Sequence, residues 1–286
     1  VYKRQVSAHV NATRVLDFLF RILRRNSIDD KGMTLENIVN CYSDQEPNQP
    51  EWINAVWWKG SMWYGQEEQP DGSFRSLSRF LDVIGHEHFH GVTEHTANLV
   101  YASLPGALNE SFSDIFGVII RNWHLAPVPG DVDTRTWEIG PGLGVGGDPL
   151  RNMADPGSVG RWRRPRATGS GYDIVMGYPD HMNQYVTLPV NQKYDWGGVH
   201  WYSNIHNLAA HNVLTSQRTD GSRIFAPEEV AILYYLVLTR LTQLSDFDDA
   251  RSELLAIAAT VHAGNPARAA EAQQAIAQAY DDVGIV

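Results

Sequence analysis

The sequence predicts an α+β protein, in which a short N-terminal part of mixed helix and strand leads into a central helix and a mainly helical C-terminal half. Two observations predict this fold class. Apolar residues recur at helical spacing over residues 12–25 and in several stretches after residue 80. Between these helices, residues 54–58 and 61–64 are rich in aromatic side chains on either side of Lys59-Gly60, a pattern typical of two short strands joined by a turn.

The helix expected at about residues 80–100 has apolar side chains on more than one side, so it should be buried in the middle of the molecule. Pro105 marks the start of the next helix, which runs to about residue 122. Residues 124–200 are poor in periodicity and rich in Gly, Pro and Asp, and an ordered loop of that length is usually functional. Further helices are expected at about residues 201–215, 227–243, 245–264 and 267–281.

The composition of the 286-residue chain is that of an ordinary globular protein, with 43% hydrophobic and 20% charged residues. Its length allows one large domain or two of about 150 residues. The formal net charge of −10 argues against binding to nucleic acid, which needs a positive surface. The single cysteine, Cys41, rules out an internal disulfide framework. No apolar run reaches the roughly 18 residues needed to span a membrane, so we expect no membrane partner either.

The stretch from His86 to His90 contains the pattern His-Glu-x-x-His, which has a physical mechanism. At about 100° per residue, His86 and His90 lie one turn apart on the same helix face, so both imidazoles can reach one metal ion. Glu87 projects to the side of that pair, close enough to touch a metal-bound water without being a ligand. His88 points about 200° away from His86, and we interpret it as a residue of the helix surface and not a ligand.

Catalytic zinc takes three protein ligands and keeps one position open. The next helix offers a third ligand in Glu110, with Asp114 one turn later on the same side. If the two helices pack antiparallel through a short turn near residues 101–105, Glu110 completes a site with the two motif histidines. Asp114 and Asn109 would then hydrogen-bond the distal nitrogens of those histidines. The alternative, that Glu110 and Asp114 are a solvated helix face, is disfavoured by the motif upstream.

These residues and the blocks around them resemble the core of the thermolysin-like zinc endopeptidases. The matching blocks follow in the family's order and spacing at residues 54–55, 93–101, 106–114, 151–156, 195–200 and 280–284. The resemblance covers the chain from about residue 8 to its end. It implies the zincin fold of that family, with a truncated N-terminal peptidase domain at residues 1–101 that includes the zinc-binding helix, and a mainly helical C-terminal domain at residues 102–286.

The resemblance implies a zinc-dependent endopeptidase whose partner is a peptide or protein substrate. One catalytic zinc ion would be held by His86, His90 and Glu110. Glu87 would be the general base that takes a proton from the zinc-bound water and passes it to the leaving amine. Zinc would acidify that water and polarise the scissile carbonyl.

The resemblance also implies residues that stabilise the developing oxyanion. His200 and Tyr101 would take this role, and Asp195 would orient His200. On its own, a histidine such as His200 would be unremarkable. The glycine pair before it, at residues 197–198, and its matching position indicate the functional role.

The substrate backbone would be bound by Asn54, Ala55 and Arg151, which would fix an extended peptide beside an edge strand. The positions that match the family's primary specificity pocket are all apolar: Phe74, Leu77, Val83, Ile139 and Leu150. We therefore expect cleavage on the N-terminal side of bulky hydrophobic residues such as leucine or phenylalanine.

Members of this family usually bind two calcium ions near the active site through five acidic residues. The matching positions in this sequence are Asp82, Arg121, Thr136, Glu138 and Pro141. Two carboxylates cannot supply the charge and coordination that calcium prefers, so we expect the double-calcium site to be lost. We hypothesise that Arg121 replaces the cations and pairs with Asp82 and Glu138.

The family typically carries several dozen more residues of β-structure before the point where this chain starts, so we expect either a naturally short member or a fragment. The second hypothesis for function follows from this: a catalytically impaired, truncated zincin that binds zinc or peptide without turnover. The catalytic residues do not favour it, because every required position is present. The resemblance implies a secreted, extracellular protein, and we expect a monomer.

Overall fold

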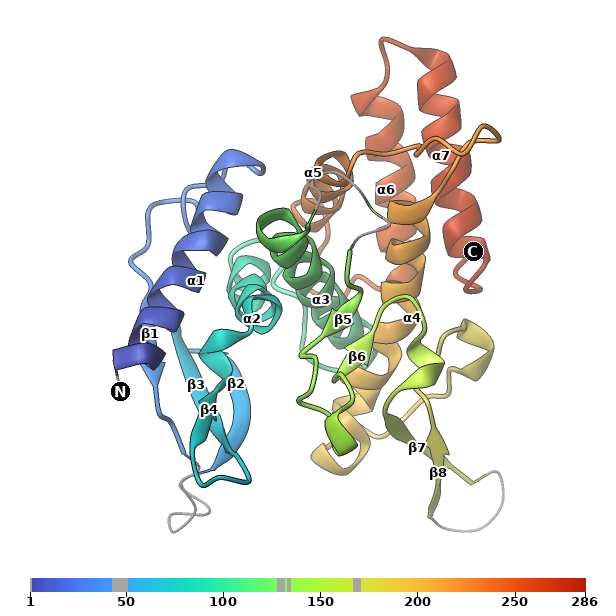
Figure 1. The fold of residues 1–286 in the computed structure, drawn as a ribbon. Coiled ribbons are helices and arrows are strands. Elements are labelled where there is room, and N and C mark those ends of the chain that lie inside the picture. Colours follow the sequence, from blue (N-terminus) through green and yellow to red (C-terminus); the bar gives the residue numbers. More distant parts are fainter. Residues whose placement is uncertain (1, 43–50, 128–131, 133–134, 167–170) are drawn as a thin grey trace.

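The computed structural model describes residues 2–42, 51–127, 132, 135–166 and 171–286. Its N-terminal part combines one long helix, α1 (Tyr2–Arg21), with a small sheet (Figure 1). The sheet has the strand order β1-β3-β2, with β4 also paired to β3. Its strands are β1 (Glu36–Val39), β2 (Trp52–Trp58), β3 (Ser61–Glu68) and β4 (Phe74–Ser76).

The hairpin of β2 and β3 confirms the predicted pair of strands and the turn between them. Trp58 pairs with Ser61, and the two residues between them, Lys59 and Gly60, have φ values of 51° and 78°. Positive φ at both central positions is the backbone of the tight turn that joins twisted antiparallel strands. Strand β3 lies between β1 and β2, so one edge of β2 is occupied by β3. Among the described residues, the other edge of β2 pairs with no strand. An edge of this kind can be extended by a peptide.

Two long helices cross at the centre of the molecule, α2 (Leu81–Glu94) and α3 (Ser103–Leu125). They approach closely where glycines face each other, because a Cβ on Gly85 would lie 3.0 Å from the Cα of Gly117. Almost all of α2 is buried, as its apolar residues on several sides predict. Because the two helices cross closely, polar side chains of α2 and α3 lie next to each other near the crossing.

The C-terminal half lies beyond α3 and is mainly helical, which confirms the α+β class (Figure 1). Four helices form it: α4 (Asp195–Thr215), α5 (Pro227–Leu238), α6 (Phe247–Val261) and α7 (Pro266–Asp281). The described part of residues 124–200 contains two short strand pairs: β5 (Glu138–Ile139) with β6 (Arg151–Asn152), and β7 (Arg161–Pro165) with β8 (Tyr172–Met176). The buried apolar residues form one cluster from α1 to the C-terminal end. A domain division at residue 101 stays a prediction.

The start of α1 and the end of α2 differ from the predicted boundaries for physical reasons. α1 begins at Tyr2 and not near residue 12, because small buried side chains at Ala8 and Ala12 form its packing face and leave no large apolar stripe to recognise. α2 ends before the predicted residue 100. Asn98 has a left-handed φ of 50°, and its N–H binds the carbonyl of Thr93 at 2.7 Å, which closes the helix end.

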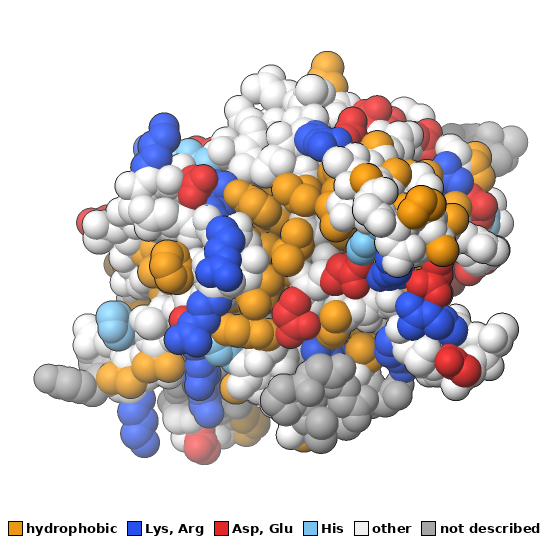
Figure 2. Space-filling model, turned by 90° about the horizontal axis from the view of Figure 1, so that it is seen from above, with side chains coloured by type: hydrophobic (Ala, Val, Ile, Leu, Met, Phe, Trp, Pro, Cys, Tyr) orange, Lys and Arg blue, Asp and Glu red, His pale blue; other side chains and the backbone are white. Residues whose placement is uncertain are grey.

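The surface shown in Figure 2 mixes charges of both signs. A row of lysine and arginine side chains lies beside a central group of apolar side chains, and aspartate and glutamate side chains lie on the same face. Within the described ranges, none of the helices combines the length and the apolar character that a membrane span requires.

Candidate metal centre and active-site cleft

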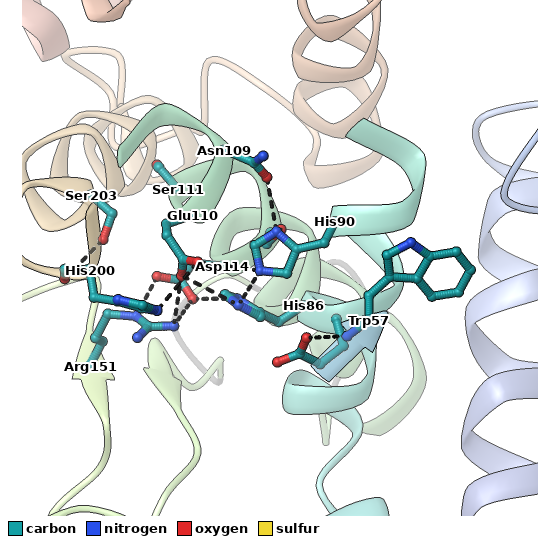
Figure 3. A network of polar contacts seen from close by, with 12 residues as sticks. Trp57, His86, His90, Asn109, Glu110, Ser111, Asp114, Arg151, His200 and Ser203 are labelled. Atoms are coloured by element: carbon teal, nitrogen blue, oxygen red, sulfur yellow. Dashed lines mark hydrogen bonds and ion pairs between the residues drawn. The ribbon is translucent and has the colours of Figure 1, made fainter. Parts of the chain in front are cut away.

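His86 and His90 of α2 point toward the same place as Glu110 of α3 (Figure 3). The Nε2 atoms of His86 and His90 lie 3.0 Å apart, and carboxylate oxygens of Glu110 lie 3.5 and 3.4 Å from those two nitrogens. Tetrahedral ligands at about 2.0–2.1 Å from one zinc ion lie about 3.3 Å from one another. The three side chains that were predicted as ligands therefore have the spacing of a zinc site.

The hydrogen bonds of these histidines also fit a bound cation. His86 Nδ1 lies 2.8 Å from a carboxylate oxygen of Asp114, and His90 Nδ1 lies 2.9 Å from Oδ1 of Asn109. Both partners are acceptors, so each neutral ring carries its proton on Nδ1 and has a bare Nε2. Two lone pairs then face each other at 3.0 Å, an arrangement that a cation between them makes favourable. Oε2 of Glu110 is buried and has no hydrogen-bond partner within the described part of the chain, as a free ligand atom would.

Asp114 is fully buried and holds His86 in place. Arg151 donates two hydrogen bonds of 2.6 Å to its carboxylate, and the side-chain amide of Asn207 donates a third at 2.8 Å. Burial alone would raise the pKa of Asp114, but the Arg151 guanidinium outweighs it and keeps that pKa well below its usual range. An ionised Asp114 fixes the tautomer in which His86 Nε2 is free to bind metal. The contacts predicted for Asp114 and Asn109 are thus present.

A buried chain of hydrogen bonds continues from Asn207 into the C-terminal helices. Ser111 Oγ donates to Asn207 Oδ1 at 2.7 Å and lies 2.7 Å from His206 Nδ1, and His206 Nε2 lies 2.8 Å from the hydroxyl of Tyr280. Because the one proton of Ser111 goes to Asn207, His206 must donate through Nδ1 and accept from Tyr280. Burial lowers the pKa of His206 to about 3, which keeps it neutral. Sequence reasoning missed this chain, since no local pattern links residues so far apart.

Glu87 lies beside the metal-facing residues and lines the same cleft. Its Oε2 accepts a hydrogen bond of 3.1 Å from the backbone N–H of Trp57 in β2. Burial raises the pKa of Glu87 to about 7, while His90 opposes this shift and Glu110 adds to it. A carboxyl group with a pKa near neutrality can both accept and release a proton.

A left-handed turn at the start of α4 aims His200 at the same site, six residues before the helix start that the sequence predicts. Residues 195–198 all have positive φ, between 52° and 92°. This turn lets Asp195 bind His200 twice, with Oδ1 at 2.6 Å from Nδ1 of the ring and Oδ2 at 2.7 Å from the backbone N. His200 Nε2 then lies 3.4 Å from Glu110 and 3.2 Å from the hydroxyl of Tyr101.

The charges around His200 and Tyr101 favour their protonated forms. Burial alone would lower the pKa of His200, but the carboxylates of Glu110 and Asp195 outweigh it and raise that pKa to about 9. Tyr101 donates a hydrogen bond to Glu110, and burial together with this carboxylate raises the pKa of Tyr101 well above its usual value. Both groups therefore carry their protons at neutral pH and can donate to a negatively charged oxygen.

His88 is buried, so its interpretation as a helix-surface residue is wrong. Its Nδ1 lies 2.7 Å from the carbonyl oxygen of Ile84, and its ring centroid lies 6.4 Å from that of Trp57. Strand β2 covers the side of α2 that faces away from the metal-facing histidines, which makes this position part of the core. Burial lowers the pKa of His88 to about 4.

Two hollows meet at these residues. The larger is a cleft of about 690 Å³, with β2 on one side and the turn before α4 on the other. The smaller is a pocket of about 100 Å³, whose walls contain four of the five predicted specificity residues: Leu77, Val83, Ile139 and Leu150. Both hollows share walls made by Asn54, Ala55, His86, Glu87 and His200. Arg151 also reaches the wall of the pocket, so the predicted substrate-binding residues other than Phe74 gather here.

Phe74 lies outside this pocket, contrary to the prediction. Strand β4 pairs it with Glu68 near α1, where the guanidinium of Arg4 lies 6.0 Å from its ring centroid. It lines a separate hollow with residues of α1. Leu143 and Ile53 complete the walls of the pocket instead. Leu143 is an apolar residue within a glycine-rich loop, and that was the only signal in the sequence that could have pointed to it.

Arg121 does not form the ion pairs that were predicted for it. Among the described residues, no ion pair within 4.0 Å joins Arg121 to Asp82 or Glu138. Asp82 is buried, and its Oδ2 accepts a hydrogen bond of 2.7 Å from the N–H of Gly140. Burial raises the pKa of Asp82, while this hydrogen bond and the charge of Arg121 act against the shift. The backbone is therefore the direct partner of this carboxylate, and Arg121 acts on it at longer range.

Comparison with known families gives two matches that together span most of the chain. The family described as "Thermolysin metallopeptidase, catalytic domain" matches residues 2–94. The family described as "Thermolysin metallopeptidase, alpha-helical domain" matches residues 97–285. Among solved structures, the fold is similar to that of the precursor of protealysin, a metalloproteinase from Serratia proteamaculans, with a TM-score of 0.74 and 30% identity. This likeness covers 98% of the present chain and 78% of the other.

Three relatives show how much of a longer protein the chain corresponds to. Neutral protease NprE of Bacillus pumilus is 35% identical over 268 residues, which are 93% of this chain and 74% of the relative. Bacillolysin of Bacillus subtilis (strain 168) is 35% identical over 268 residues, or 93% of this chain and 43% of the relative. The extracellular elastase of Staphylococcus epidermidis is 36% identical over an alignment of 287 positions, which covers 98% of this chain and 46% of the relative. The chain thus spans less than half the length of two of these relatives.

Proposed function

The chain belongs to the thermolysin metallopeptidase family, and from that premise we propose that it is a zinc-dependent endopeptidase. The observation that carries the proposal is the pair of bare imidazole nitrogens of His86 and His90, which face each other 3.0 Å apart beside Glu110. These three residues would hold the zinc ion. When bound there, zinc would acidify a water molecule and polarise the scissile carbonyl.

Glu87 would carry the proton in the reaction. It would take a proton from the attacking water and pass it to the leaving amine, which a carboxyl group with a pKa of about 7 can do in both directions. The N–H of Trp57 holds one of its oxygens, which leaves the other for the water. His200 and Tyr101 would donate hydrogen bonds to the oxygen that becomes negative as the water adds, with Asp195 fixing the ring of His200.

The free edge of β2 would bind the substrate as an added strand. Asn54 and Ala55 lie on this edge strand and line both hollows, so they can contact the peptide backbone on either side of the scissile bond. Arg151 lines the pocket while it is held by Asp114, which supports its role in binding a substrate carbonyl. The pocket would take the side chain that follows the scissile bond.

The size of this pocket predicts a preference for leucine over phenylalanine at that position. Its volume of about 100 Å³ is smaller than the roughly 150 Å³ of an apolar cavity that accepts a benzene ring, so a phenyl side chain requires its walls to move. One extra methylene in an apolar pocket costs about 1–3 kcal/mol, and the phenylalanine side chain has three more carbon atoms than that of leucine, so kcat/KM should favour leucine by roughly tenfold or more. Quenched peptides that differ only at this position measure the ratio. Equal or faster cleavage before phenylalanine, or cleavage before charged residues, would contradict the expectation.

Hydrolysis of casein with and without phenanthroline tests the proposed function. We expect hydrolysis that stops when the chelator removes zinc and returns when zinc is added back. Glu87→Ala, prepared in the same way, controls for a contaminating protease and should be inactive. The alternative, a truncated zincin without turnover, predicts one zinc per chain and no hydrolysis by the unaltered protein.

Removal of calcium should leave thermal stability nearly unchanged. Of the five positions at which the family usually has acidic residues, only Asp82 and Glu138 are acidic here, and the carboxylate of Asp82 is already bonded to the backbone N–H of Gly140. The melting temperature with and without EGTA, measured beside the zinc content, checks this. A large fall in melting temperature while zinc stays bound would refute it.

The location and assembly of the protein belong to the same proposal. The name of one relative, an extracellular elastase, supports action outside the cell on peptide or protein substrates. We propose that the chain acts as a monomer with two domains that meet near residue 101. Light scattering on the purified protein tests the monomeric state.

A further inference from the structure

Trp196 is a large apolar side chain that is exposed inside the cleft. It lines the hollow of about 690 Å³ together with the metal-facing residues His86, His90 and Glu110, and 45% of its surface is accessible to solvent. Other tryptophans pair with aromatic rings, as Trp162 does with Trp201, but none of the ring contacts among the described residues includes Trp196. Ring stacking among the described residues therefore does not explain why a tryptophan stands at this place.

The backbone of Trp196 makes tryptophan an unfavourable choice for stability. Its φ and ψ are 54° and 35°, which lie in the left-handed region. Any residue with a Cβ is strained there, and glycine or asparagine fits that conformation best. The next two residues, Gly197 and Gly198, follow this preference. Strained backbone of this kind concentrates at functional sites, where the side chain has a use that outweighs its cost to the fold.

The position of Trp196 indicates which part of a substrate it meets. The cleft and the smaller pocket join at Glu87 and His200, but Trp196 lines the cleft and not the pocket. Val56 and Trp57 of β2 also line the cleft. A peptide that lies along β2, with the residue after the scissile bond in the pocket, has its preceding residues in the cleft beside Trp196.

We propose that Trp196 is a specificity-determining residue that packs against an apolar or aromatic side chain immediately before the scissile bond. The indole offers a large rigid apolar surface, and Val56 of β2 contributes a second apolar residue to the lining of the same cleft. This inference rests on the proposed peptidase function and deepens it, because it names the substrate class that the cleft selects.

Two quenched peptides test the proposal, identical except for phenylalanine or glycine immediately before the scissile bond and with leucine after it. The unaltered protein should cleave the phenylalanine peptide with the higher kcat/KM. In Trp196→Asn this preference should fall by roughly three- to tenfold, the range expected for loss of an aromatic contact. The melting temperature should stay the same or rise, because asparagine tolerates the left-handed backbone. Trp196→Phe keeps an aromatic ring and should retain most of the preference.

Trp58→Asn is the matched control, since Trp58 is 53% exposed on β2 but does not line the cleft. It should leave the preference unchanged. An unchanged preference in Trp196→Asn would overturn the proposal, and so would an equal loss of activity on both peptides. Calorimetry measures the dissociation constants of the same two peptides for Glu87→Gln and for the double variant with Trp196→Asn. If the unaltered protein cleaves neither peptide, the proposed function fails, and the ratio of the two dissociation constants still decides the role of Trp196.

Discussion

Replacing Glu87 with glutamine should lower kcat for peptide hydrolysis by roughly 10²- to 10⁴-fold, the usual contribution of a general base. Glutamine keeps the shape of the side chain and can still accept the hydrogen bond from the N–H of Trp57, which lies 3.1 Å from Oε2 of Glu87. It cannot take a proton from the attacking water. Because Glu87 is not among the three metal-facing residues, the variant should bind as much zinc as the unaltered protein. Steady-state hydrolysis of a leucine peptide, measured beside the zinc content, gives both quantities.

Glu94→Gln is the matched control for that substitution. Glu94 also lines the cleft and also bonds to Trp57, through the indole N–H at 2.7 Å, but it does not face the metal centre. Its replacement should change kcat far less than the replacement of Glu87. If Glu87→Gln kept most of its activity, or if both variants lost activity equally, the assignment of the general base would be wrong.

Replacing Arg151 with methionine should lower the free energy of unfolding by about 3–5 kcal/mol, the cost of leaving one partner of a buried ion pair without the other. Arg151 bonds to both carboxylate oxygens of Asp114, which is fully buried. Methionine fills part of the same space but donates no hydrogen bond, so the charge of Asp114 would remain in the interior with Asn207 and His86 as its partners among the described residues. Urea denaturation, carried out in the Glu87→Gln background to prevent self-cleavage, measures the loss.

Arg21→Met provides the comparison, because Arg21 pairs with Asp17 on the surface of α1, where the side chain of Arg21 is exposed and that of Asp17 is partly exposed. Exposed pairs of this kind are worth at most about 1 kcal/mol, so this variant should lose much less stability. Similar losses in the two variants would mean that the Asp114–Arg151 pair does not support the centre as described. A loss of bound zinc in Arg151→Met alone would be a second sign of that support, since Asp114 holds His86.

The sequence predicts those parts of the site that depend on local spacing. His86 and His90 face the same way because four residues make one helical turn, and Asp114 lies behind Glu110 for the same reason. Lys59-Gly60 forms the predicted turn because a two-residue hairpin needs positive φ at both positions. The resemblance to a known family placed Arg151 among the substrate-binding residues, but the contact of Arg151 with Asp114 was not predicted and comes from the structure.

The errors come from features that depend on what packs against an element. His88 is on the far side of α2 from the metal-facing residues, but strand β2 lies over that side and buries it. Leu143 lines the pocket and Phe74 does not, because the path of the glycine-rich loop determines which apolar residue reaches the pocket. The hydrogen bonds from Ser111 to Asn207 and His206 join residues that are more than 90 positions apart, and no periodicity in the sequence indicates such a contact.

X-ray absorption at the zinc K-edge of the purified protein tests most directly the claim that His86, His90 and Glu110 hold one zinc ion. The geometry of these side chains predicts a shell of nitrogen and oxygen atoms at about 2.0–2.2 Å, with outer scattering from two imidazole rings. A shell that contains sulfur at about 2.3 Å, or one that lacks imidazole scattering, would contradict the account.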